Sequence, residues 1–396
     1  MKKFGVILGL TMIFLFAANV FAAGGGQAAA PKTPIKIGMY ADLTAGSAQW
    51  GTDCQKGGQL KVKEINAAGG ILGRPVELIV YDCAQSPTEG VRAYTRLAQV
   101  DRVAAVNGSL QSNIALAVQP VSEQLKIPVV TRALDERVTT PQFNENDPDK
   151  VLPPANYFFL TQPSAFQHAG IIASYAVHEL KMNTFAMLFT PGNAYALFLA
   201  KGFEYYVKKH GKQIVGSFEF QAGDQDFRPQ LTRIRELNPD GLFITNYIQD
   251  NTNAVKQSRE LGVKSRFLGN NSWYKPMDQT AGAAADGAYF PNNFAFDNPK
   301  FAKFIAAYRA EFKEDPGLHS FSGYDDVGLM LDAIVRAGTD DPVKVTEALK
   351  NTKGYKGVVA DITMNPQTHR PDKISMAILK FVGANIESVE YEYYAK

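Results

Sequence analysis

Residues 35–83 constrain the fold of this chain most strongly, because they form one complete strand–helix–strand pattern. Apolar residues alternate over positions 35–39, which predicts a strand, and then recur at helical spacing over positions 60–68. Two glycines at 69–70 end the helix, since glycine readily adopts the left-handed conformation that caps helices. A second apolar strand follows at 76–81. Parallel strands joined in this way form a right-handed unit, and ligands bind at the carboxyl ends of such strands.

The same alternation of strand and helix patterns continues along the chain and predicts a doubly wound α/β fold. The 396 residues exceed what one ordinary core organises, so we expect two lobes. A long irregular stretch at 135–155 contains several prolines and is either functional or a surface segment. Further strands are predicted at 103–106, 127–131, 157–161, 185–189, 214–220, 242–245 and 267–268.

The sequence lacks the patterns of common enzymes. The first strand-to-helix turn contains only Gly46 and Gly51, whereas a dinucleotide-binding turn needs three spaced glycines. There is no phosphate-binding lysine loop and no Gly-x-Ser-x-Gly nucleophile turn. The formal net charge of +2 argues against a nucleic acid partner. We therefore expect a non-catalytic binding protein without metal or cofactor. The histidines lack metal-ligand spacing, and we interpret each as an ordinary surface or core residue: His168, His178, His210, His319 and His369.

The N-terminus is typical of an exported protein. Residues 1–22 combine a basic start, an apolar stretch too short for a comfortable membrane span and a small-residue cleavage site. We expect a signal peptide that is cleaved after Ala22 or Ala23. Residues 23–33 would form a mobile leader, because their composition cannot build a core. No cysteine at this junction can accept a lipid, which favours a free periplasmic protein.

Three features of the first unit resemble the type I periplasmic binding proteins, specifically the leucine/isoleucine/valine-binding branch of the receptors that serve ABC importers. They are the AQWG turn at 48–51, the EINAAGGILGRP segment at 64–75 and the acidic strand end at 81–82. The resemblance implies two doubly wound lobes joined by a three-strand hinge, a small ligand between them, a membrane permease as partner and a monomer. The alternative is a ligand-sensing module of the same fold that serves a signalling partner. The implied lobes are 34–161 with 294–361, and 162–293 with 362–396.

Ser112 is the candidate anion contact. It opens a predicted helix at 114–124, where backbone N–H groups are unpaired and the helix dipole is positive. From the residues alone, a ligand contact and an ordinary helix cap are equally good interpretations. The resemblance favours the first, because the serine at this place in the leucine-binding branch holds the ligand's carboxylate.

Four aromatic residues are candidates for the walls of the ligand site. Trp50, Tyr195 and Tyr247 lie in predicted loops at the carboxyl ends of strands, and Tyr324 heads a predicted helix. For each of them, packing in the core is the alternative interpretation. The resemblance places Trp50 against the ligand's side chain and Tyr324 toward the cleft.

The sequence departs from the amino-acid-binding pattern in two places. Asp135 follows Ala133 after the fourth strand, where the family has a hydroxyl residue, and Asn271 lies where the family has an acidic residue. Either Asp135 holds the ligand's ammonium, or the ligand is not an ordinary α-amino acid. We therefore expect a hydrophobic or aromatic amino acid, with an amide, urea or an aromatic acid as the alternative. Arg132 is a second candidate anion contact, or it neutralises Asp135 or Glu136 instead.

Cys54 and Cys83 are the only cysteines, and we expect them to form a disulfide. Export places them in an oxidising compartment. One begins the first helix and the other ends the second strand, two positions that the strand–helix–strand unit brings to the same sheet edge.

Overall fold

The computed structural model describes residues 33–221 and 223–396. Its first sheet has five parallel strands in the order β2-β1-β3-β4-β5. β1 pairs with β2 along its whole length, from Ile35 opposite Val76 to Ala41 opposite Asp82. The strands are β1 (Ile35–Ala41), β2 (Val76–Asp82), β3 (Val106–Asn107), β4 (Val129–Thr131) and β5 (Phe158–Leu160).

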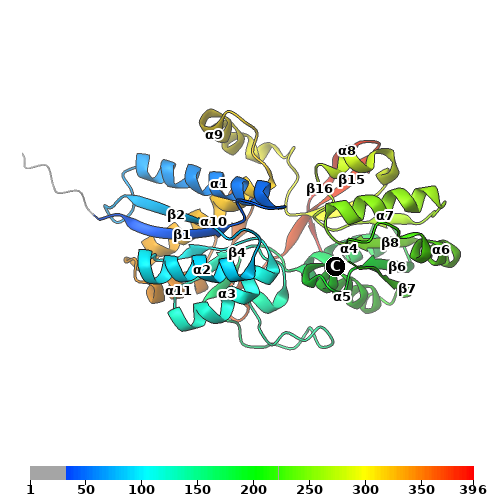
Figure 1. Cartoon of the computed structure of the whole chain (residues 1–396), viewed down its shortest axis with the longest axis horizontal. Helices are drawn as coiled ribbons and strands as arrows, with labels where there is room; N and C mark the ends of the chain where they lie inside the picture. Colours follow the sequence, from blue (N-terminus) through cyan, green and yellow to red (C-terminus); the bar gives the residue numbers. More distant parts are fainter. Residues whose placement is uncertain (1–32, 222) are drawn as a thin grey trace, which may run out of the picture. The chain divides into compact units, whose positions relative to one another are not determined.

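Helices cover both faces of this sheet (Figure 1). Alternate residues of β1 point to opposite faces: Ile37 and Met39 join one hydrophobic cluster, and Tyr40 joins the other. We call the sheet with its helices the five-stranded unit. The helices on one face are α1 (Ala48–Ala67), α10 (Leu318–Ala337) and α11 (Pro342–Lys350), and those on the other are α2 (Pro87–Arg96) and α3 (Ser112–Leu125).

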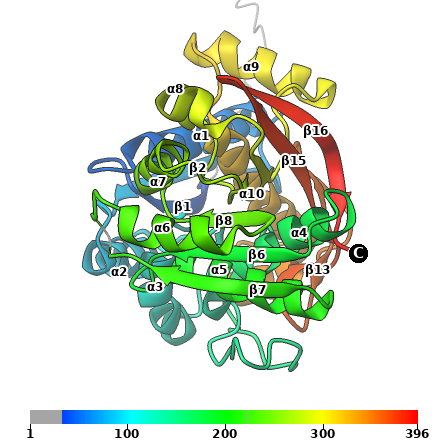
Figure 2. The ribbon, with the colours of Figure 1, turned by 90° about the vertical axis from the view of Figure 1, so that its right-hand side faces the viewer.

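Five parallel strands of the second sheet repeat this relative order, as β7-β6-β8-β9-β10, and the antiparallel β15 and β16 extend the sheet beyond β10 (Figure 2). We call this sheet with its helices the seven-stranded unit. Its strands are β6 (Thr184–Phe189), β7 (Gln213–Glu219), β8 (Gly241–Thr245), β9 (Arg266–Leu268), β10 (Tyr289–Asn292), β15 (Ser375–Val382) and β16 (Asn385–Tyr394). One face carries α4 (Ala165–His178) and α5 (Ala194–Lys209), and the other carries α6 (Arg228–Leu237), α7 (Ile248–Glu260) and α8 (Met277–Ala281).

The described chain passes between the units after β5, after β10 and before β15. Two hydrogen-bonded groups connect these crossings. Asn293 donates to Gln162 at 2.5 Å, which joins the second crossing to the first. Ser164 donates to Glu136, and Arg370 donates to the carbonyl oxygen of Glu136 at 3.1 Å, so the first and third crossings meet at one buried residue.

α1 and α10 pack with unusually close backbones. A Cβ atom added to Gly57 would lie 1.9 Å from the carbonyl oxygen of Ser320, and one added to Gly323 would lie 1.9 Å from that of Cys54. Only glycine fits at these two positions without moving a helix. The close packing sets the start of α10 beside the first turns of α1.

Residues 135–155, which we call the strap, leave the five-stranded unit after β4 and return to it at β5. Between these ends, Phe143 packs against Phe166 and Phe198 of the seven-stranded unit, with ring centroids 5.6 and 5.8 Å apart. Tyr205 on α5 donates to Asp149 at 2.5 Å. The strap is therefore attached to both units.

The predicted doubly wound α/β fold is confirmed, with each predicted strand present and shifted by at most a few residues. The lobe boundaries stay a prediction. The predicted signal peptide and most of the leader lie outside the described residues. No helix in the described part of the chain is both long and apolar enough to cross a membrane.

The predicted disulfide is wrong in this structure, where Cys54 and Cys83 are free and buried. Cys54 packs in the cluster on the α1 face of the sheet, whereas Cys83 packs in the cluster on the α2 face. The Cys54 thiol donates to Asn107 at 3.3 Å and the Cys83 thiol to Asp42 at 3.0 Å. The residues share a sheet edge, but their side chains lie on opposite faces of the sheet.

Candidate ligand-binding site

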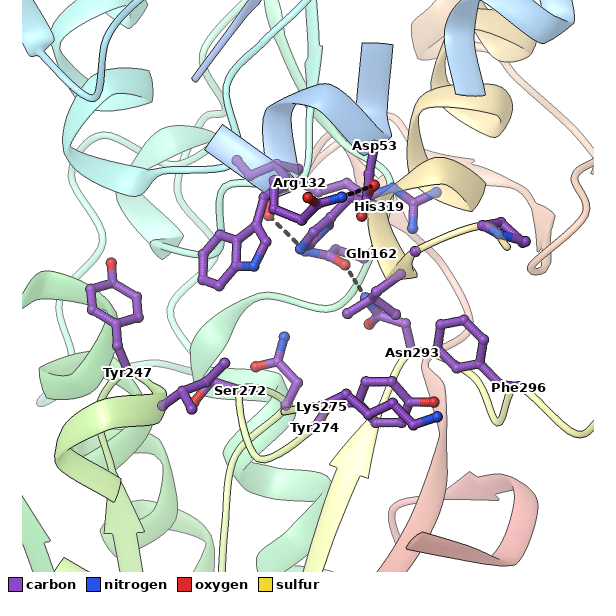
Figure 3. Close-up of a pocket in the computed structure, with 18 of the residues that line it drawn as sticks. Asp53, Arg132, Gln162, Tyr247, Ser272, Tyr274, Lys275, Asn293, Phe296 and His319 are labelled. Atoms are coloured by element: carbon purple, nitrogen blue, oxygen red, sulfur yellow. Dashed lines mark hydrogen bonds between the residues drawn. The ribbon is translucent and has the colours of Figure 1, made fainter. Parts of the chain in front are cut away.

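A cavity of about 650 Å³ lies at the carboxyl ends of the parallel strands and is lined by both units. In each sheet the strand order reverses beside the first strand of the unit, and such points are where doubly wound folds bind ligands. Figure 3 shows residues of the five-stranded unit on one side, among them Asp53, Arg132 and His319, and Ser272 and Lys275 of the seven-stranded unit on the other.

The N-terminus of α3 forms one part of the wall, through Ser112 and the two residues before it, Leu110 and Gln111. Within the part of the chain that the structure describes, no side chain caps the N-terminus of α3. The hydroxyl oxygen of Ser112 accepts a hydrogen bond from the backbone N–H of Asp135 at 3.1 Å, so its own proton is available to a ligand. Unpaired N–H groups, a helix dipole and a hydroxyl donor together favour an anion at this place.

A row of four aromatic rings forms another part of the wall and spans both units. Tyr195 and Tyr247 stack with ring centroids 5.7 Å apart and planes 9° apart. Trp50 lies 6.3 Å from Tyr247 and 5.4 Å from His319. The row therefore offers an apolar and aromatic surface from α1 across to the ends of β6 and β8.

The end of β9 contributes an amide to the wall. Tyr195 donates its hydroxyl proton to Asn271 Oδ1 at 2.5 Å. Burial raises the pKa of Tyr195 well above its ordinary value, so the phenol remains a donor at neutral pH. This bond orients the side chain of Asn271, whose Nδ2 atom can then donate to a ligand.

A buried ion pair lies directly behind the wall of the five-stranded unit. Arg132 Nε contacts Asp326 Oδ1 at 3.1 Å, and both side chains are almost fully buried. Asp326 also accepts from Thr161 at 2.7 Å and from Asn107 at 3.3 Å. Arg132 itself also lines the cavity, and its role as an anion contact stays a prediction.

Five predicted site residues line the cavity, and three do not. Trp50, Ser112, Tyr195, Tyr247 and Asn271 are brought together as expected. Ala133 is fully buried outside the lining. Tyr324 also lies outside, because α10 begins at Leu318 and Tyr324 is nearly two turns further along, where its hydroxyl group donates to Glu64.

The predicted role of Asp135 as a contact for the ligand's ammonium is corrected by the structure. Its carboxylate accepts three hydrogen bonds from Arg137, two at 2.9 Å and one at 2.5 Å, and it caps a short 3₁₀ turn. The side chain is buried and does not line the cavity. A carboxylate paired in this way is not available to a ligand's ammonium.

Asp53, Gln162 and His319 line the cavity but were missed in the sequence. Burial lowers the pKa of His319 to about 3, so its ring is neutral at physiological pH. Gln162 donates to the carbonyl oxygen of Arg132 at 2.6 Å and holds the first crossing against the cavity wall. Gly317 directly precedes a helical pattern in the sequence. This signal could have predicted the start of the helix and, with it, the position of His319 at the wall.

The arrangement defines a class of protein, one in which two doubly wound units enclose a small-molecule cavity at their strand ends. The chain belongs to the periplasmic binding protein family, because the family model with the description "Periplasmic binding protein" matches residues 34–383. Proteins of this family are extracytoplasmic substrate-binding receptors. The resemblance to the leucine/isoleucine/valine-binding branch is confirmed by individual relatives.

Two curated relatives and one solved structure are similar over most of their lengths. The Leu/Ile/Val-binding protein homolog 3 of Brucella melitensis is 28% identical over 383 residues, which are 95% of this chain and 99% of the relative. The leucine-, isoleucine-, valine-, threonine-, and alanine-binding protein of Pseudomonas aeruginosa is 24% identical, covering 85% and 87%. LivJ of Streptococcus pneumoniae, solved in complex with isoleucine, superposes with a TM-score of 0.77 at 25% identity, covering 91% of this chain and all of LivJ.

Proposed function

We propose that this chain is the extracytoplasmic receptor of an ABC importer and that it binds an amino acid with a mainly apolar or aromatic side chain. The observation that carries the proposal is that the α3 N-terminus and the aromatic row face one cavity. The names of the relatives support the amino acid class. Export would use residues 1–22 as a signal peptide.

The two features hold different parts of such a ligand. The carboxylate rests on the first turn of α3 and accepts the proton of Ser112. The side chain lies along Trp50 and Tyr247. Burying a side chain of leucine size contributes about 1.5 to 3 kcal/mol.

A ligand in this position touches both units and so favours a closed arrangement. Ser112 and Trp50 belong to the five-stranded unit, whereas Tyr195, Tyr247 and Asn271 belong to the seven-stranded unit. A ligand that binds the closed form more tightly shifts the population toward it. The hydrogen-bonded crossings would act as the hinge, and the closed form would be the one that a permease recognises.

An aromatic acid is the second candidate, and the environment of Asp135 favours it. Because Arg137 occupies that carboxylate, the ammonium partner expected from the sequence is lost. An aromatic carboxylate needs only the α3 N-terminus and the aromatic row.

A melting-temperature screen followed by calorimetry tests the proposal. The panel contains leucine, phenylalanine, leucinamide, 3-phenylpropanoate, a nucleotide and a sugar. We expect the amino acids to raise the melting temperature, since ligands that bind only the native state stabilise it. Ser112→Ala should weaken the binding of every ligand that has a carboxylate but not the binding of leucinamide. If only the nucleotide or the sugar raised the melting temperature, the proposal would be wrong.

A further inference from the structure

The cavity extends beyond what a short amino acid needs. Its volume of about 650 Å³ lies within the range of about 300–1,000 Å³ that is typical for drug-sized ligands. One end contains the α3 N-terminus with Ser112. The other end is lined by Asp53 on α1, by Ile305 and Arg309 on α9 (Ala302–Phe312), and by residues 314–319.

Asp53 lies further along α1 than the residue that contacts the α3 N-terminus. Gln111, at that N-terminus, donates to Ser47 at 2.6 Å, and Ser47 precedes the first residue of α1. Asp53 follows Ser47 by six residues, which correspond to about 9 Å along a helix. The carboxylate and ammonium of an α-amino acid share one carbon atom, so we assign Asp53 to a ligand group further from the carboxylate than the α-ammonium.

The carboxylate of Asp53 is buried without a cation. The residue is only 5% exposed, and Gln49 donates to Oδ1 at 2.7 Å. No other donor and no lysine or arginine contacts this carboxylate within the described residues. The neighbouring acidic residues, in contrast, have cationic partners: Glu314 pairs with Lys56 at 2.6 Å, and Asp315 pairs with Arg309. Burying an unpaired carboxylate is costly, so this group is incomplete without a partner.

The backbone next to Asp53 is shaped to leave room for the carboxylate. A Cβ atom added to Gly317 would lie 1.8 Å from Asp53 Oδ2. Burial raises the pKa of Asp53 to about 6, so the group is mostly ionised at pH 7.5.

We propose that the Asp53 end of the cavity is a second ligand subsite, which takes a cationic nitrogen at the far end of an elongated amino acid. The ligand's carboxylate lies on α3, its apolar stem follows Trp50 and the aromatic row, and its terminal ammonium or guanidinium pairs with Asp53. This inference rests on the proposed function, which supplies the position of the ligand's carboxylate.

Lysine and norleucine test the subsite, because they have the same number of side-chain carbon atoms and only lysine carries the terminal ammonium. We expect calorimetry at pH 7.5 to show that wild-type protein binds lysine at least tenfold more tightly than norleucine. Asp53→Asn should lower the affinity for lysine at least tenfold and change the affinity for norleucine less than threefold. Gly317→Ala should also lower the affinity for lysine selectively, since the added methyl group occupies the space of Asp53 Oδ2. This second variant keeps the test valid if Asp53→Asn folds poorly.

Asp135→Asn is the matched control, since it neutralises a buried carboxylate that does not line the cavity. It should leave the lysine-to-norleucine ratio unchanged. Equal wild-type affinities for the two ligands, or equal losses in Asp53→Asn, would overturn the subsite and leave the proposed function standing. If wild-type protein bound no amino acid at all, the proposed function would fail and the subsite with it.

Discussion

The two units place the same strand order around the cavity but stabilise their strand ends with different chemistry. In the five-stranded unit the buried groups behind the wall are charged, with Asp326 paired to Arg132 and Asp325 accepting from the backbone N–H groups of Val358 and Val359 at 2.7 and 2.9 Å. Burial raises the pKa of Asp325 to about 6. The five-stranded unit therefore carries ionisable groups in its interior.

The corresponding place in the seven-stranded unit is filled by amides and hydroxyls. Asn270 donates to Thr245 at 2.8 Å and to the carbonyl oxygen of Asn246 at 3.1 Å. Asn251 and Ser272 donate to the same carbonyl oxygen, both at 2.7 Å. These groups keep their charge state at every pH at which the protein folds.

The difference shows that topology decides where a doubly wound unit binds and leaves the chemistry of the wall open. A charged interior is costly to break and responds to pH, because a lost partner leaves an unpaired buried charge. An amide interior is cheaper to disturb and does not titrate.

The largest expected effect is that of Asp326→Ala. It should lower the free energy of unfolding by about 3 to 5 kcal/mol, because it leaves Arg132 as an unpaired buried cation. Urea unfolding followed by circular dichroism measures the loss. The control Asp332→Ala removes a partly exposed pair with Arg336 and should cost less than about 1 kcal/mol. Similar losses in the two variants would contradict the charged-interior interpretation.

Asn270→Ala should have a smaller effect in the other unit. We expect a loss of about 1 to 3 kcal/mol, since the substitution leaves buried hydrogen-bonding groups without partners. Because Asn270 and its partners Thr245 and Asn246 do not titrate, the loss should be similar at pH 5 and pH 8. A loss that changed strongly between these pH values would break the contrast between the units.

Asp53→Asn should stabilise the ligand-free protein. The pKa of this acid is raised by burial from 3.8 to about 6, so ionisation above pH 6 disfavours the folded state. At about 1.4 kcal/mol per pKa unit, this rise in pKa corresponds to a gain of up to about 3 kcal/mol at pH 8. It should shrink as the pH falls from 6 toward 3.8 and vanish below. A gain that stayed constant between pH 6 and pH 3.8 would show that the stabilisation does not come from removing the ionised carboxylate.

The smallest effects are expected in the aromatic row. Tyr195→Phe removes the donor to Asn271 and should weaken amino acid binding by about 0.5 to 1.5 kcal/mol, or up to about tenfold. Tyr247→Phe keeps the stacked ring and should cost less than about 0.5 kcal/mol, because the side chain is partly exposed and water can solvate the groups that the hydroxyl leaves. Calorimetry with one ligand compares the two variants directly. A larger loss in Tyr247→Phe would mean that its hydroxyl, rather than that of Tyr195, contacts the ligand.

The sequence predicted the fold and the part of the site that depends on strand ends. Trp50, Ser112, Tyr195, Tyr247 and Asn271 all follow parallel strands, so the rule that ligands bind at carboxyl ends placed them together.

Other parts of the site depend on facts that spacing along the chain does not contain. Asp53 and His319 meet because α1 and α10 pack closely through glycines 266 residues apart, Gly57 and Gly323. Asp135 was misinterpreted because Arg137, two residues away, takes its carboxylate, and the direction of a loop side chain is not visible in a sequence. The predicted disulfide was wrong for a related reason, since a shared sheet edge does not fix the face on which each cysteine side chain lies.

The contacts of the strap lead us to expect a particular route by which ligand enters and leaves. Both of its ends belong to the five-stranded unit, while Phe143 and Asp149 are attached to α4 and α5 of the other. Separating the units on this side would strip Phe143 from its contacts, whereas α9 lies at the opposite side of the units in both views (Figures 1 and 2). We therefore expect the mouth to open beside α9, next to Asp53, so that the cationic end of an elongated ligand is the last to enter and the first to leave.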